Sequence, residues 1–222
     1  MRFAGTCFRA HDPRWSFSPL SGEGARLWGG RFNPRGMPAL YLSLSISTAV
    51  KEANQGFARK IEPCVLCSYD VDCADIADLR HAQTRRRFQV SRRAMSCAWF
   101  ELAARGREPP SWAIARKLMS PGHAGALVPS FVNRATAGDQ NLVLWKWGKD
   151  LPYRISVYDP GGKLPKNQLS WGLPAQGDPR GTSISICVPD CSFLVLRRHH
   201  LPKPPIELPS WEIHEISRVR HY

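Results

Sequence analysis

The chain has 222 residues, 43% of them hydrophobic and 10% aromatic, and this composition predicts one main globular domain and excludes a wholly disordered protein. No run approaches the roughly 18 uncharged apolar residues of a membrane-spanning helix, and residues 1–10 lack the apolar run of a signal peptide, so we expect a cytoplasmic protein with no membrane association. The formal net charge of +13 predicts an anionic partner, which could be nucleic acid, a phosphate-bearing small molecule or an acidic protein.

Strands and helices are expected to follow one another without a regular alternation. Short apolar runs predict strands at 3–10, 39–44, 65–71, 126–130 and 141–147. Apolar residues at three-and-four spacing predict a helix over 92–105, and shorter helices are expected over 111–119 and over 47–54, where Ser47 is the expected N-cap. Residues 75–79 are expected to form a turn. This order of elements predicts an α+β fold.

A glycine-rich, mostly irregular stretch is expected at residues 21–36. Glycines beside Arg26, Arg31 and Arg35 suit a diphosphate, because backbone N–H groups and guanidinium groups can converge on its oxygens. The stretch contains neither a Walker motif nor a Rossmann fingerprint. From the residues alone, a surface turn with solvated arginines is an equally good interpretation.

The seven cysteines are an odd number scattered along the chain, so we expect reduced thiols rather than a disulfide framework. Cys64 and Cys67 have the spacing of redox and zinc sites. They lie in an expected strand, however, where positions three apart point to opposite faces. We therefore expect no bound metal.

The composition changes after Trp171. Residues 172–222 hold 7 of the 19 prolines and a net charge of +1, whereas residues 1–171 carry +12. The sequence therefore predicts a main domain over 1–171 and a proline-rich C-terminal extension over 172–222, to which no role is assigned.

Several spaced motifs resemble the N-terminal half and the end of a RES-family domain. They are FRAHDPRW at 8–15, PLSGEGA at 19–25, GGRFNPRGMPALYLS at 29–43, NLVLW at 141–145 and LPKNQLSW at 164–171. The resemblance covers about residues 3–171. The family is named for an arginine, a glutamate and a serine, which match Arg31, Glu52 and, in the run LVPS, Ser130.

This resemblance implies a fold and an activity. RES proteins resemble ADP-ribosyltransferase toxins, which implies a central mixed or antiparallel split sheet flanked by helices. It also implies the toxin of a bacterial toxin–antitoxin pair, with NAD as its substrate and no metal. Such an enzyme breaks the nicotinamide–ribose bond and passes ADP-ribose to water, phosphate or a protein side chain. Its partner would be a cognate antitoxin, with an acidic surface or a segment that blocks the active site, and any DNA contact would fall to that antitoxin.

The resemblance assigns five residues to this chemistry. Glu52 would stabilise the positive charge that develops on the ribose and hold its hydroxyls. Arg31 would bind the pyrophosphate bidentately, and Arg9 would add a second phosphate contact. Tyr41 would stack on nicotinamide or position the ribose, and Ser130 would orient the substrate by hydrogen bonding. His11 and His123 receive no role, because a neutral nicotinamide leaves without a general acid.

Each of these residues also has a structural interpretation. The glutamate could be a solvated helix carboxylate, the tyrosine a core side chain, the serine an ordinary turn residue, and the arginines surface or ion-paired groups. For the whole chain, two other classes stay open. One is a nucleic-acid-binding module based on the arginines at 85–87 and 92–93, and the other is a catalytically inactive interaction domain. We favour an acidic antitoxin as the partner of this basic surface.

Overall fold

The computed structural model of the protein describes residues 1–54 and 63–168, and the expected extension at 172–222 lies outside this part of the chain. Strand β3 (Val65–Cys73) illustrates how the sequence forms its strands. Cys67, Tyr69, Val71 and Cys73 are buried, while the residues between them are half-buried or exposed. Successive side chains of a strand point to opposite faces, so this period of two places one apolar face against the core.

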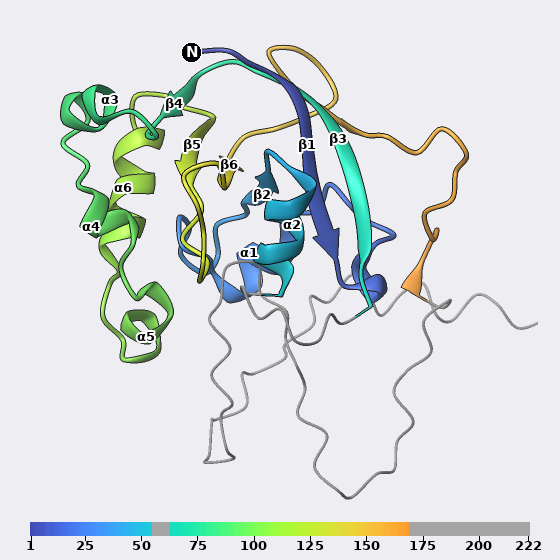
Figure 1. Ribbon diagram of the computed structural model, residues 1–222, viewed down its shortest axis with the longest axis horizontal. Helices are drawn as coiled ribbons and strands as arrows, with labels where there is room; N and C mark the ends of the chain where they lie inside the picture. The colour runs from blue at the N-terminus through green and yellow to red at the C-terminus, as the bar shows by residue number, and fades with distance from the viewer. Residues whose placement is uncertain (55–62, 169–222) are drawn as a thin grey trace, which may run out of the picture. The chain divides into compact units, whose positions relative to one another are not determined.

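The described strands form one mixed sheet in the order β4-β5-β6-β2-β1-β3-β7 (Figure 1). Their bounds are β1 Phe3–His11, β2 Leu40–Ser43, β3 Val65–Cys73, β4 Ile76–Asp78, β5 Gly125–Pro129, β6 Gln140–Leu144 and β7 Tyr153–Val157. Strands β4 and β5 pair in parallel, and the other neighbours pair antiparallel. A mixed sheet combined with helices confirms the predicted α+β fold.

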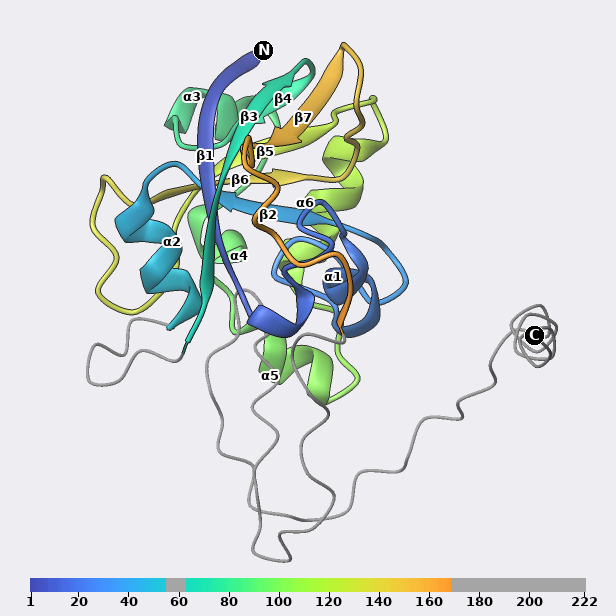
Figure 2. The same cartoon turned by 90° about the vertical axis from the view of Figure 1, so that its right-hand side faces the viewer.

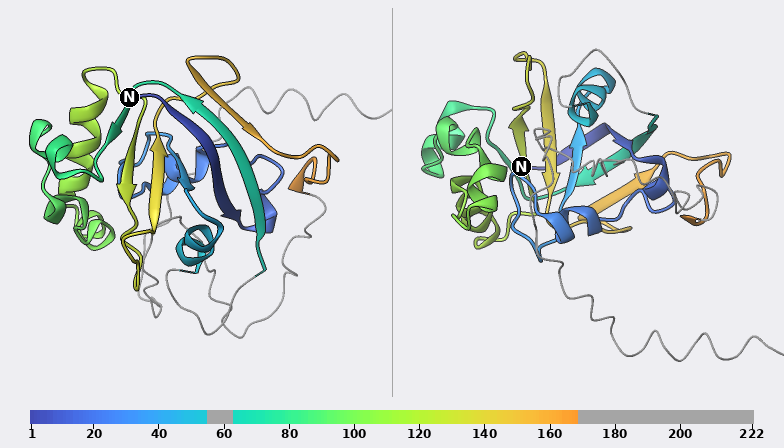
Figure 3. Two further views of the ribbon diagram at one scale, coloured as in Figure 1. Left: turned by 45° about the horizontal axis from the view of Figure 1, so that its top comes forward. Right: turned by 90° about the horizontal axis from the view of Figure 1, so that it is seen from below.

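The sheet divides between β1 and β2. Among the described residues these two strands share one register pair, Phe8 with Ser43, whereas β1 pairs with β3 along its whole length. Long β1 and β3 accordingly run away from β2, β6 and β5 (Figures 1 and 3). Away from the pair Phe8–Ser43, the facing edges of β1 and β2 therefore border a common space.

Both faces of the central strands are covered. Ala126 and Val143 belong to one core cluster, which the helices after β4 cover, whereas Leu127 and Leu142 belong to a second cluster. This second cluster also contains residues of β1, β3 and β7, including Tyr69. The two parts of the sheet thus pack against each other. Burial on both faces explains the uninterrupted apolar runs in β5 and β6.

The helices gather in two places. Their bounds are α1 Glu23–Trp28, α2 Ile46–Ala53, α3 Ala82–Arg87, α4 Arg92–Met95, α5 Trp99–Ala104 and α6 Pro110–Met119, with a 3₁₀ turn at Pro13–Trp15. Helices α3 to α6 form a layer beyond β4 and β5, and α2 lies against β1 and β2 (Figures 1 and 2). None of the described helices is long and apolar enough to cross a membrane.

Two expectations about helices were wrong in detail. The expected single helix over 92–105 is two helices, because Ala98 has φ −73° and ψ 66°, outside the helical region, and Arg31 binds backbone carbonyls beside it. The N-cap of α2 is Ser45 rather than Ser47, since the Ser45 side chain accepts a hydrogen bond from Thr48 N at 3.1 Å.

Other boundaries also differ from the expectation. Residues 75–79 include β4, because parallel pairing with β5 extends this segment. The strand expected over 141–147 ends at Leu144, where Trp145 N and Lys146 N both donate to the carbonyl of Ala124. Helix α1 lies within the stretch expected to be mostly irregular, and α3 and β7 were not expected.

Candidate active site

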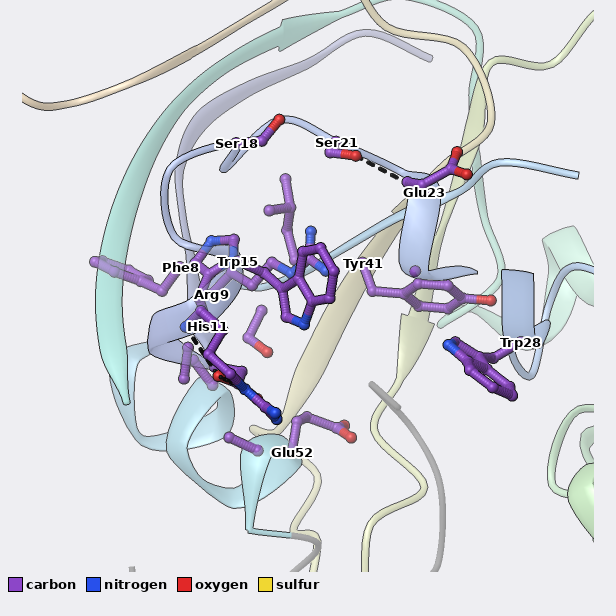
Figure 4. Close-up of a pocket in the computed structure, with 18 of the residues that line it drawn as sticks. Phe8, Arg9, His11, Trp15, Ser18, Ser21, Glu23, Trp28, Tyr41 and Glu52 are labelled. Atoms are coloured by element: carbon purple, nitrogen blue, oxygen red, sulfur yellow. Dashed lines mark hydrogen bonds and ion pairs between the residues drawn. The ribbon is translucent and has the colours of Figure 1, made fainter. Parts of the chain in front are cut away.

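A cavity of about 620 Å³ lies where β1 and β2 diverge. This volume is in the range of small-ligand sites. Its walls come from β1, the segment after it, α1, β2 and the last turns of α2, with Asn141 from β6. Figure 4 shows Trp15, Tyr41 and Glu52 around this space. Three segments distant in sequence therefore build one site.

Glu52 lines the cavity from the C-terminal half of α2. Its Oε1 accepts a hydrogen bond from Ser130 Oγ at 2.5 Å and another from Asn141 Nδ2 at 2.5 Å. Ser43 Oγ donates to Asn141 Oδ1 at 2.8 Å, and Ser43 faces Asn141 in the register of β2 and β6. This network fixes the orientation of the Glu52 carboxylate at the cavity wall.

Ser130 follows the end of β5 and is 7% exposed. Its N–H donates to the carbonyl of Asp139 at 2.8 Å, which closes the loop between β5 and β6. Its hydroxyl donates to Glu52, and Ser130 is not among the residues that line the cavity. Ser130 is therefore placed to orient Glu52, and its expected bond to substrate stays a prediction.

Tyr41 lines the cavity from β2. Its hydroxyl donates to Asn33 Oδ1 at 2.7 Å and accepts from Phe32 N at 2.9 Å. Asn33 Nδ2 in turn donates to the carbonyls of Ala25 and Met37, both at 2.8 Å. The hydroxyl thus anchors the turn that precedes β2, and Tyr41 also contributes to the cavity wall.

The part of the glycine-rich stretch that follows α1 is a turn held by hydrogen bonds of Asn33 and Tyr41. A Cβ added to Gly30 would lie 2.6 Å from both Tyr41 Oη and Asn33 Oδ1. Gly29 has φ +76°, which favours glycine. Arg26 is exposed and forms an ion pair with Glu23. Gly30 therefore allows close packing against Tyr41, whereas Gly29 supplies a backbone conformation that favours glycine.

Arg31 is 8% exposed and is not among the cavity residues. Its Nη1 donates to the carbonyls of Cys97 at 2.8 Å and Met95 at 3.3 Å. Its guanidinium carbon lies 5.0 Å from the ring centroid of Phe131, the residue after Ser130. Arg31 therefore lies over the Phe131 ring and outside the cavity wall, and its bond to pyrophosphate stays a prediction.

Arg9, on β1, lines the cavity, and so does Arg14, which forms an ion pair with Asp12 at 2.6 Å. His11 is buried beside Arg9 and shares a hydrogen bond with the Tyr69 hydroxyl. Burial, together with the positive charge of Arg9, lowers the pKa of His11 to about 3. His11 is therefore neutral near pH 7, and the positive charge on this wall comes from the arginines.

Aromatic side chains line much of the rest of the cavity. Trp15 is 58% exposed and Trp28 is 43% exposed, and Phe8 and Phe17 also line the space. Exposed apolar side chains that cluster around one space, unlike singly scattered ones, are typical of a ligand or partner site. Their flat faces suit the stacking of a planar ring.

The sequence of the chain matches a known protein family. The sequence model of the RES domain matches residues 6–167. The chain belongs to the RES family. RES domains are associated with NAD-related toxin–antitoxin proteins and with NAD-related enzymatic activity. No curated protein matches the chain significantly.

The RES domain of this chain contains site residues that the sequence did not point to. Asn141 and Ser43 complete the network around Glu52, and Asp139 binds the helix that carries it. Ser43 and Asn141 lie in two of the motifs that carry the resemblance. The sequence signal that could have indicated them is their position: Ser43 is a polar residue at the end of the apolar strand β2, and Asn141 is one near the start of β6.

Among the described residues, no group of three or more His, Cys, Asp or Glu side chains is placed to hold a metal ion. Cys64 is exposed and precedes β3, which begins at Val65, whereas Cys67 is buried within this strand. Cysteines and histidines after residue 168 lie outside the described part of the chain.

Proposed function

We propose that this RES protein is the toxin of a toxin–antitoxin pair that cleaves the nicotinamide–ribose bond of NAD and transfers ADP-ribose to an acceptor. One observation carries the proposal: the carboxylate of Glu52, oriented by Ser130 and Asn141, lies at the wall of a cavity of about 620 Å³ that also contains Arg9 and exposed aromatic rings.

Cleavage of this bond requires an anion near the ribose. The bonding electrons leave with nicotinamide, which departs neutral, and the ribose acquires the character of a positively charged oxocarbenium ion. A carboxylate that is already oriented stabilises this charge without reorganising during the reaction. Glu52 has this role, and it also accepts hydrogen bonds from the ribose hydroxyls.

The other groups of the cavity bind the dinucleotide. Arg9 and, at the mouth, Arg14 contact the pyrophosphate, while the aromatic rings stack on the bases. The Tyr41 ring stacks on nicotinamide. Arg31 does not line the cavity and its Nη1 donates to the carbonyls of Met95 and Cys97, so its contact with pyrophosphate requires a movement of this side chain or of the cavity wall.

The partner of this toxin is an antitoxin with an acidic surface. Residues 80–119, which contain α3 to α6, have ten Lys or Arg and two Asp or Glu, a net charge of +8. Arg86, Arg87, Arg92 and Arg93 are exposed on this layer. An acidic antitoxin surface docks there, and DNA contact falls to the antitoxin.

The test is incubation of the purified chain with NAD, with and without phosphate and cell lysate, followed by mass spectrometry. The proposal predicts release of nicotinamide. Free ADP-ribose indicates water as the acceptor, phosphorylated ADP-ribose indicates phosphate, and a modified protein indicates transfer to a side chain. No nicotinamide under any of these conditions would contradict the proposal.

A further inference from the structure

Asp139 is a buried carboxylate outside the cavity with four different donor groups. It is 3% exposed. Lys51 Nζ donates to its two oxygens at 2.8 and 3.0 Å, and Thr48 Oγ1 donates at 2.9 Å. Thr136 donates through its N–H at 2.7 Å and its hydroxyl at 2.8 Å. Burial alone opposes ionisation, but these donors outweigh it and hold the pKa of Asp139 well below its usual range.

Two of these donors belong to the helix that carries Glu52. Thr48 lies one turn before Glu52 on α2, and Lys51 is its direct neighbour. Asp139 belongs to the loop between β5 and β6, which begins at Ser130 and leads into Asn141. This loop and the start of β6 therefore bind Glu52 directly through Ser130 and Asn141, and they bind its helix through Asp139.

Helix α2 depends on such contacts. It has eight residues, and isolated helices of this length are marginal in water. Ser45 caps the first turn through Thr48 N, and Asp139 binds the Thr48 side chain in that turn and Lys51 in the last turn. Because a buried charge that loses its partner is costly, the position of Lys51 is coupled to that of Asp139.

We propose that Asp139 is a positioning residue for the reaction: by binding Thr48 and Lys51 it fixes α2 so that the Glu52 carboxylate stays aimed at the ribose. The proposal rests on the function proposed above for Glu52. Asp139 does not line the cavity, and it acts by fixing the position of α2. A misplacement of about 1 Å can cost on the order of 100-fold in rate.

Kinetics of three variants separate positioning from general stability. Asp139→Asn and Lys51→Met are each expected to lower kcat on the order of 10- to 100-fold, while the Kd for NAD changes by less than about threefold. NAD binding persists because Arg9 and the aromatic rings lie on other elements. Lys51→Arg keeps the ion pair and is expected to restore most of kcat.

Two controls sharpen this test. Asp72, on β3, pairs with Arg2 and Arg154 away from the cavity, and Asp72→Asn is expected to leave kcat unchanged. In a Glu52→Gln background, Asp139→Asn is expected to cause no further loss of the residual rate, because both changes act through the same carboxylate. A full additional loss would overturn the proposal, as would equal losses of kcat and NAD binding.

Amide hydrogen exchange of α2 tests the contact without NAD. In Asp139→Asn and in the milder Thr48→Val, the amides of Ile46–Ala53 are expected to exchange on the order of tenfold faster than in the wild type, while those of α6 are unchanged. Unchanged exchange in α2 would overturn the proposal. If the wild-type protein releases no nicotinamide, the proposed function fails, and this measurement still decides whether Asp139 holds α2.

Discussion

Buried polar side chains of this protein have roles that depend on their immediate neighbours. His11 shares a hydrogen bond with Tyr69, whose hydroxyl donates to the carbonyl of Pro19 at 3.1 Å. Burial and the charge of Arg9 keep the His11 imidazole neutral. Although histidine is a common acid–base catalyst, His11 is neutral and hydrogen-bonded to Tyr69, so it stabilises the cavity wall.

The titration of His11 predicts a dependence of stability on pH. Its pKa is lowered to about 3 in the folded protein, whereas an unfolded histidine titrates near about 6.5. Between these values the unfolded chain binds more protons, so the free energy of unfolding should fall as the pH is lowered, by up to about 1.4 kcal/mol per pH unit. Urea unfolding of the wild type and His11→Gln between about pH 5 and pH 7 measures this. Equal slopes for the two proteins would contradict it, and His81→Gln, at an exposed histidine, is the matched control.

The turn between α1 and β2 packs closely against Tyr41 of β2 because one of its residues, Gly30, has no side chain. Gly30 leaves room for the bond between Tyr41 and Asn33, whereas a Cβ added to Gly24, on exposed α1, meets no atom within 4 Å. The two glycines thus have opposite roles, although both belong to the same glycine-rich stretch of the sequence.

These two positions give opposite predictions. Gly30→Ala should lower the free energy of unfolding by about 1–3 kcal/mol, because the new methyl group displaces Tyr41 or Asn33. Gly24→Ala should raise it by about 0.5–1 kcal/mol, since alanine favours the helix. Chemical denaturation of both variants checks the pair. A Gly30→Ala protein as stable as the wild type would show that the turn is not as tightly packed as the distances indicate.

Local sequence patterns predicted the long elements well and their interruptions poorly. Alternating or apolar runs were enough for the strands at 3–10 and 65–71, which the structure extends to β1 and β3. The break between α4 and α5 depends on Arg31, more than 60 residues earlier, which binds carbonyls at that break. Contacts of this kind have no local signal, so periodicity alone predicted a continuous helix.

For the candidate site, the sequence likewise indicated some residues and missed contacts between distant segments. The family motifs pointed to Glu52, Tyr41 and Arg9, and all three line one cavity. The motifs did not indicate that Arg31 lies over the Phe131 ring and outside the cavity wall, because the direction of a side chain depends on the packing of other elements. Nor did they point to Asp139, whose partners on α2 are 88 and 91 residues away.

Charge is distributed unevenly over the whole molecule. Residues 80–119 carry a net charge of +8, whereas the whole chain carries +13. The cavity lies near the middle of the sheet order, between β2 and β1, whereas the arginine-rich helices lie beyond β4 and β5 at one end of it. Partner binding and catalysis can therefore be changed separately.

This separation predicts the effect of charge reversal. Replacing Arg92 and Arg93 with glutamate should weaken antitoxin binding and make it less sensitive to salt, while nicotinamide release stays at the wild-type rate. Binding to the co-expressed antitoxin at two salt concentrations measures this. The matched control reverses Lys163 and Lys166, which are exposed outside the helical layer. Tight binding of duplex DNA by the purified chain at physiological salt would instead favour a nucleic-acid partner.

The most direct test of the account is the rate of nicotinamide release by Glu52→Gln. The amide keeps the size of the side chain and removes the charge that stabilises the ribose, so the rate should fall at least about 100-fold while NAD still binds. Glu101→Gln, at an exposed glutamate on α5, should cleave NAD like the wild type. A Glu52→Gln protein that releases nicotinamide at the wild-type rate would contradict the assignment of Glu52.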